Sequence, residues 1–205
     1  MRTMLFKPLA LVALATILTP ALAGGIAHSR RAAAAAGLQG APHDLQFIDM
    51  MIMHHQGGIE MARLAESKGR LAQLKEFARK SIEDQQKDTE ELQSRRDQLF
   101  SGQPKAESMM MRGRQMTMAE MQKKMQDDMS KLQAAAPGNQ FDRTFLDLFT
   151  EHHRMAIQMS RDEIAMGRQA EIKAIAQKTI DKQSKDINEM SRMKRMLGGK
   201  RGKKG

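Results

Sequence analysis

The sequence contains a long internal repeat, and this duplication constrains the fold more than any other feature. Shifted by 98 positions without a gap, residues 47–92 align with residues 145–190. The aligned identities include an aromatic residue, a histidine pair and a Gly-Arg pair: Phe47 and Phe145, His54-His55 and His152-His153, Gly69-Arg70 and Gly167-Arg168. Apolar residues recur at helical spacing in both copies. We therefore expect an all-α domain, a four-helix bundle in which a helical hairpin occurs twice.

Capping and stop residues predict four helices within a domain spanning 44–197, at about 44–68, 70–100, 139–167 and 169–197. We expect Asp44 to cap the first helix, and Asn139 with Asp142 to open the third. Gly69 and Gly167 are expected to end the first and third helices in the left-handed conformation.

The connector between the repeats, residues 101–138, is rich in methionine. Thr117 and Glu120 have the spacing of a capping box, which predicts a short fifth helix after them. Ahead of that helix, Met109, Met110 and Met111 stand in a segment with Gly and Arg that we expect to be a loop with no core to fill. We therefore interpret these three methionines as contacts for a metal or a partner.

The N-terminal segment indicates export, and the C-terminal segment is a basic tail. Residues 1–23 have a basic start, an uncharged apolar run and an A-x-A ending, which is typical of a cleaved Sec-type signal peptide and predicts a periplasmic protein. Residues 24–43 read as an Ala- and Arg-rich linker, and residues 198–205 as a basic disordered tail. The tail predicts at most a weak attraction to a membrane surface.

The amino-acid composition limits the kinds of metal site and partner that the chain can have. The 205 residues include no Cys, so disulfides, thiolate zinc sites, iron–sulfur clusters and thiol nucleophiles are excluded. Soft-metal chemistry would fall to His nitrogen and to the sulfur of the 20 Met residues. The net charge of +10 does not indicate a nucleic-acid partner, because the chain has 7 Phe and neither Trp nor Tyr to stack on bases.

The histidine pairs lie on the same helices as several methionines. Helical phase places His55 in the buried stripe and His54 about 100° away on a flank, so we expect each pair to serve two directions. The candidate metal ligands are the paired histidines, the methionines near them and the connector run: His54, His55, Met50, Met51, Met61, His152, His153, Met155, Met159, Met109, Met110 and Met111. Imidazole and thioether together favour Cu(I), and Ag(I) by the same softness, over zinc, calcium or magnesium. The simpler alternatives are core histidines with satisfied nitrogens and methionines that only fill space.

The first repeat resembles the domain-of-unknown-function 305 family (DUF305). The resemblance rests on the block Phe47 to Ala62, on its second copy Phe145 to His153, and on the Met-Thr-Met-Ala-Glu-Met stretch that begins at Met116. It implies ferritin-like four-helix proteins that are exported, some of them tied to copper binding and tolerance, with no established catalysis. The chain departs from the family pattern at Met53 and Glu151, where Pro is common, and at Phe149, where the first copy has Met.

Three functions are compatible with these features or need to be weighed against them. The first is a non-enzymatic protein that binds Cu(I), buffers it or passes it to another copper-handling protein. The second is a metal-independent periplasmic chaperone that uses a flexible Met surface. The third, a di-metal oxidase, needs Glu-x-x-His pairs, and neither histidine pair has Glu three positions before it.

Overall fold

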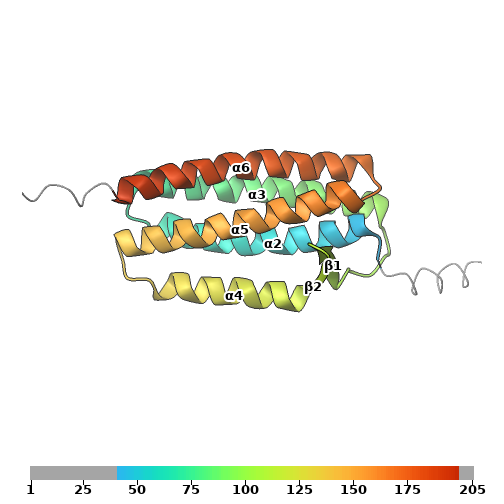
Figure 1. The fold of residues 1–205 in the computed structure, drawn as a ribbon, viewed down its shortest axis with the longest axis horizontal. Coiled ribbons are helices and arrows are strands. Elements are labelled where there is room, and N and C mark those ends of the chain that lie inside the picture. The colour runs from blue at the N-terminus through green and yellow to red at the C-terminus, as the bar shows by residue number, and fades with distance from the viewer. Residues whose placement is uncertain (1–40, 199–205) are drawn as a thin grey trace, which may run out of the picture. The chain divides into compact units, whose positions relative to one another are not determined.

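The structure is a computed structural model that describes residues 41–198 (Figure 1). The expected signal peptide, most of the expected linker and the tail beyond residue 198 lie outside the described residues. No helix of the described segment has the length and apolar character needed to cross a membrane.

The prediction of an all-α bundle made of a duplicated hairpin is confirmed, and so is the connector helix. The elements in chain order are α2 (His43–Lys68), α3 (Ala72–Leu99), β1 (Ser108–Met111), β2 (Arg114–Thr117), α4 (Met118–Ala134), α5 (Asn139–Met166) and α6 (Ala170–Gly198). The two short strands form an antiparallel hairpin that was not predicted.

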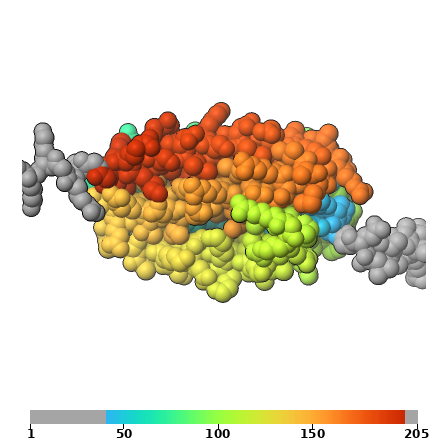
Figure 2. All heavy atoms as spheres, in the orientation of Figure 1, coloured from blue at the N-terminus to red at the C-terminus, as the bar shows by residue number. Residues whose placement is uncertain are grey.

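The helices that carry the histidine pairs are the inner ones. α2 buries 15 of its 26 residues and α5 buries 13 of 28, whereas α3 buries 7 of 28 and α6 buries 8 of 29. α2 packs against α5, while α3 packs on α2 and α6 packs on α5. α4 lies along α2 and α5 on the side away from α3 and α6 (Figure 1), and with the hairpin it forms one flank of the molecule (Figure 2). The inner helices are therefore covered on more than one face, which requires apolar residues around much of their circumference.

The caps predicted for α2 and α5 differ from those observed. Asp44 does not cap its own helix, because it accepts hydrogen bonds from the backbone N–H groups of Arg168 (3.0 Å) and Gln169 (2.7 Å) at the start of α6. Its repeat mate Asp142 accepts from the N–H groups of Arg70 (2.8 Å) and Leu71 at the start of α3. Each repeat thus caps the outer helix of the other repeat.

Asn139 does not cap α5 either. The N-cap residue is Gly138, and no side chain caps this helix. The Asn139 side-chain oxygen instead accepts a hydrogen bond of 2.8 Å from Arg70.

The glycines that end α2 and α5 are required for space rather than for a left-handed backbone, which corrects our expectation. Their φ angles are −56° at Gly69 and −64° at Gly167. A Cβ at Gly69 would stand 2.5 Å from the Ala65 carbonyl oxygen, and one at Gly167 would stand 2.0 Å from a carboxylate oxygen of Glu163. The chain turns so tightly at both points that no side chain fits.

The hairpin changes the interpretation of the connector methionines. Arg112 and Gly113 have φ angles of 52° and 74°, as a two-residue type I′ turn requires, and Met109 pairs with Met116 across the strands. Met109 and Met111 are buried in the same apolar cluster as Met116, so the expectation of a loop without a core is wrong for them, and only Met110 in the run is exposed. The predicted capping box of α4 is present.

Candidate functional site

Four imidazoles meet at the contact between α2 and α5, and we call them the histidine core: His54, His55, His152 and His153. Each is at most 5% exposed. The rings of His54 and His152 stack with centroids 3.7 Å apart and planes 15° from parallel. Within each pair the centroids are 6.2 Å and 6.1 Å apart. The two pairs therefore form one cluster, and His54 is buried rather than placed on a flank.

Most nitrogens of the histidine core have no hydrogen-bond partner. Both ring nitrogens of His54 and of His55 are buried and unpartnered, as are Nε2 of His152 and Nδ1 of His153. Leaving a buried polar group without a partner costs roughly 1–3 kcal/mol. The simpler reading, in which hydrogen bonds satisfy these nitrogens, does not describe His54 or His55.

Burial keeps three of these imidazoles neutral. It lowers the pKa of His55 to about 3, with His153 and Lys182 as weaker contributors. Burial also lowers the pKa of His54 and of His152 well below the usual value for histidine, and the neighbouring histidines reinforce the effect. A neutral imidazole has one nitrogen lone pair available, which is the form that binds a metal.

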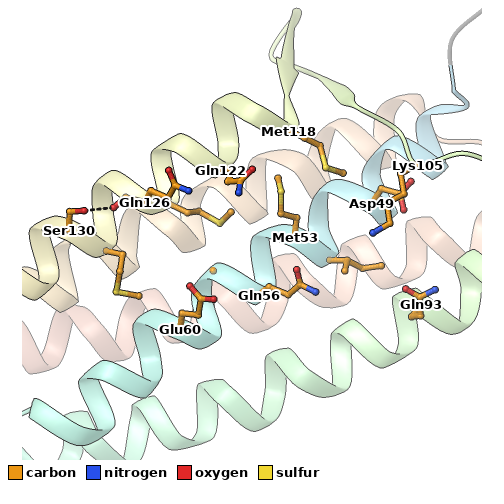
Figure 3. A pocket seen from close by; sticks show the side chains of 14 residues that line it. Asp49, Met53, Gln56, Glu60, Gln93, Lys105, Met118, Gln122, Gln126 and Ser130 are labelled. Carbon is orange, nitrogen blue, oxygen red and sulfur yellow. Dashed lines mark hydrogen bonds between the residues drawn. The ribbon is translucent and has the colours of Figure 1, made fainter.

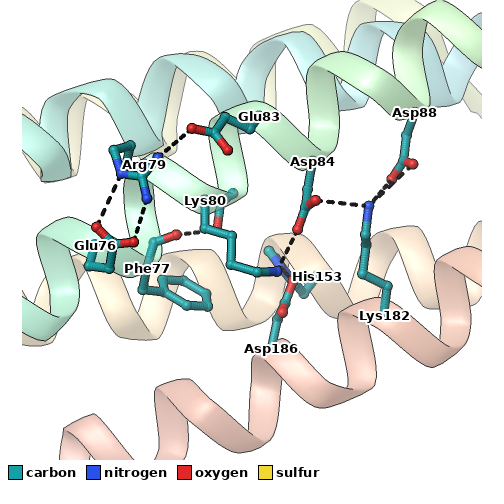
Figure 4. A network of polar contacts seen from close by, with 11 residues as sticks. Glu76, Phe77, Arg79, Lys80, Glu83, Asp84, Asp88, His153, Lys182 and Asp186 are labelled. Atoms are coloured by element: carbon teal, nitrogen blue, oxygen red, sulfur yellow. Dashed lines mark hydrogen bonds and ion pairs between the residues drawn. The ribbon is translucent and has the colours of Figure 1, made fainter.

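His153 differs from its repeat mate because a carboxylate orients it. Its Nε2 lies 3.2 Å from Asp186 Oδ2 (Figure 4). A carboxylate can only accept, so Nε2 carries the proton and the unpartnered Nδ1 presents its lone pair to the core. Asp88, the repeat mate of Asp186, is paired with Lys182 at 3.0 Å. His55 consequently has no carboxylate partner.

Small and aromatic residues shape the space around the histidine core. A Cβ at Gly58 would stand 2.5 Å from Nε2 of His152 and 2.3 Å from Oε1 of Gln85, so only glycine admits these groups beside α2. The side-chain amide of Gln85 is buried and unpartnered as well. Phe149 packs at 5.5 Å from the His152 ring and 4.5 Å from the His153 ring. The departure at Phe149 thus places an aromatic wall where the first repeat has a thioether.

The predicted methionine ligands are distributed unevenly. One apolar cluster contains Met50, Met51, Met109, Met111 and Met159, with Met155 packed against it, and the other cluster contains Met61. Met50, Met51, Met61, Met109 and Met159 are at most 1% exposed, so their sulfurs are enclosed. Met110 is 39% exposed.

Four methionines line a groove of about 610 Å³ between α2 and α4 (Figure 3), and none of them is among the candidate ligands named above, although the three on α4 belong to the Met-rich connector for which the sequence predicted metal or partner contacts. These are Met53 on α2, and Met118, Met125 and Met129 on α4. The spacing of seven and eleven residues from Met118 was an available signal, because it puts the three on one face of a helix. Among residues 41–198, no three His, Asp or Glu side chains converge to hold an ion.

Comparisons with known proteins agree with the fold. The family described as domain of unknown function (DUF305) matches residues 19–96 and, in a second match, residues 44–194. No curated protein matches the chain in sequence. CopM in its Cu(I)-bound form is 28% identical, with a TM-score of 0.60 over 76% of this chain and 98% of CopM. CopM in its Cu(II)-bound form is 29% identical, with a TM-score of 0.58 over 73% of this chain and 94% of CopM. A DUF305 protein from Streptomyces coelicolor is 21% identical with a TM-score of 0.64, covering 80% of this chain and 98% of its own.

Proposed function

The chain belongs to the DUF305 family, and from this premise we propose that it is an exported copper-binding protein that holds Cu(I), or Ag(I), through imidazole and thioether ligands. Its role would be to buffer copper or to confer tolerance, without catalysis. The observation that carries the proposal is the histidine core, in which neutral, buried imidazoles have nitrogens without partners.

The donor chemistry fits a soft monovalent ion. Neutral imidazole and thioether bring no negative charge, whereas calcium and magnesium sites draw on oxygen ligands and zinc sites commonly combine imidazole with thiolate, carboxylate or water. The unpartnered nitrogens also offset part of the cost of binding, because they lose no existing hydrogen bond when they bind an ion. Because no three His, Asp or Glu side chains of residues 41–198 converge on one point, one or two of the unpartnered imidazoles would bind the ion, with thioether sulfur completing its coordination.

The likeness to CopM supports the choice of metal. CopM has been solved with Cu(I), with Cu(II) and with silver, and its likeness to this chain spans nearly the whole of CopM. Export is proposed from the signal-like pattern of residues 1–23.

Competition titration tests the proposal. The purified protein is titrated with Cu(I) against a chromogenic chelator, and with Zn(II) in parallel. We expect Cu(I) to bind more tightly than Zn(II), and the double variant His54→Phe with His152→Phe, which retains aromatic packing, to lose Cu(I) affinity. His43→Gln is the matched control, because His43 lies outside the histidine core and contacts Glu163 instead. Equal zinc binding, or unchanged Cu(I) binding in the double variant, contradicts the proposal.

The chaperone alternative finds little support on the described surface. Within residues 41–198, the large apolar side chains that are exposed are Met110, Met166 and Met196, and they belong to three different elements. A surface that holds unfolded chains needs a contiguous apolar patch.

A further inference from the structure

We propose that the groove between α2 and α4 is a second soft-metal site, in which the thioether sulfurs of Met53, Met118, Met125 and Met129 bind Cu(I) or Ag(I) from solvent. We call these four residues the groove methionines. The choice of metal rests on the proposed function, but the site is separate from the histidine core and uses different donor atoms.

Accessibility distinguishes the groove methionines from the other candidate thioethers. All four are half-buried and line an open groove of about 610 Å³. In contrast, Met50, Met51 and Met159 are each at most 1% exposed inside the apolar core. An ion arriving from solvent can reach the groove sulfurs without opening the bundle, and it cannot reach the core sulfurs in that way.

The local structure directs these side chains into one space. Met118, Met125 and Met129 share one face of α4, and Met53 reaches toward them from α2 (Figure 3). Gly57 makes the approach possible, because a Cβ there would stand 2.2 Å from the sulfur of Met125. The absent side chain at Gly57 therefore lets a thioether sulfur lie directly against the backbone of α2.

The charges around the groove balance one another and offer no hard-metal site. Glu60 lines the rim and is exposed, while Lys105 opposes it. Asp49 also lines the groove, but Arg96 and the backbone N–H of Ala106 already occupy its carboxylate. The remaining polar lining consists mainly of neutral amides, so sulfur is the donor that selects the ion.

The groove lies next to the histidine core. Gly57, against Met125, is followed directly by Gly58, whose absent Cβ leaves room for Nε2 of His152. Two adjacent residues of α2 thus contact a groove sulfur and an unpartnered imidazole nitrogen, respectively. The groove and the histidine core therefore lie on neighbouring faces of α2.

Silver titration of the full chain carrying methyl-¹³C methionine tests the site directly, because Ag(I) is redox-stable and binds the same soft donors. We expect the methyl signals of the groove methionines to shift at the first additions of Ag(I), before those of the core methionines. The variant M53L/M118L/M125L/M129L keeps size and apolarity, and we expect it to bind at least one silver ion fewer per chain. The control variant M166L/M196L removes two exposed thioethers elsewhere and should retain the parental stoichiometry.

Two outcomes overturn the proposal: groove methyl signals that do not move while silver binds, and an unchanged stoichiometry in the groove variant. The signals are measured in the parent protein, so the test holds even where the groove variant folds poorly. The variant H54F/H152F separates this proposal from the proposed function. Groove shifts that persist in H54F/H152F support the groove even where that variant binds copper like the parent and so contradicts the histidine core.

Discussion

The two repeats place the same residue types at equivalent positions and then surround them differently. His54 and His152 stack on each other across the repeat boundary, so the first histidines of the pairs are nearly equivalent. The second histidines are not, because Asp186 orients His153 while the matching Asp88 is paired with Lys182. Lys182 aligns with Asp84 of the first repeat. This one difference in charge gives Asp88 a lysine partner. Duplication therefore supplies ligands in pairs, and single substitutions on the outer helices set how each is presented.

The largest expected effect is the loss of folding stability at acidic pH, which tests the neutral buried imidazoles that both repeats share. His55 has a folded-state pKa of about 3 and titrates near 6.5 when unfolded, so the unfolded state binds more protons between these values. The contribution of His55 to the free energy of unfolding is fully present above pH 6.5 and decreases as the pH drops. At pH 5 the loss from His55 alone is about 2 kcal/mol. The lowered pKa values of His54 and His152 add losses of the same sign. Glu163, with a raised pKa of about 6, opposes them by about 1 kcal/mol.

Urea unfolding of the metal-free protein at pH 7 and pH 5 measures this loss. His55→Leu should reduce the pH dependence by the His55 contribution, whereas Phe145→Leu, a buried substitution without a titratable group, should lower stability equally at both pH values. An unfolding midpoint that does not change with pH would contradict the prediction.

The second prediction compares one ion pair in its two copies. Arg96 contacts Asp49 at 2.6 Å with side chains 12% and 2% exposed, and the matching pair of Lys194 and Asp147 is 41% and 59% exposed. Arg96→Met strands a buried carboxylate and should cost about 3 kcal/mol. Lys194→Met should cost under about 1 kcal/mol, because solvent already screens that pair. Equal losses in chemical denaturation would show that burial does not separate the two copies.

The third prediction concerns the crossing caps. Asp142→Ala removes the acceptor for two N–H groups at the start of α3 and should cost about 2 kcal/mol. Asp44→Ala should cost less, because it also relieves repulsion with the buried Glu163 carboxylate, which the first repeat replaces with Ala65. Thermal unfolding compares them, with Asp142→Asn as the control that keeps an acceptor oxygen. A larger loss in Asp44→Ala would reverse the asymmetry.

The smallest effect concerns metal affinity. Asp186→Asn removes the carboxylate that fixes the tautomer of His153 and should weaken Cu(I) binding about tenfold. Asp88→Asn should leave the affinity unchanged, because Asp88 pairs with Lys182 rather than with His55. Competition titration of both variants measures these affinities. Equal affinities in the two variants would show that Asp186 does not orient His153 for binding.

The helices could be predicted because duplication and apolar periodicity are local signals that reinforce each other. The crossing caps of α3 and α6 could not, because Asp44 meets its partners 124 and 125 residues away, and no local pattern distinguishes that contact from an ordinary N-cap. The burial of His54 was missed, since α2 is covered by α4 and α5 in addition to α3. The hairpin was missed because Arg112 takes a positive φ that its residue type does not favour.

The crossing caps have a consequence for how the molecule is assembled. Each repeat supplies the aspartate that caps the outer helix of the other repeat, so neither hairpin alone can cap its own outer helix. A cut within the connector would leave two fragments, each with an open helix end that the other fragment is shaped to close. Such fragments should associate in solution and form one domain that unfolds cooperatively.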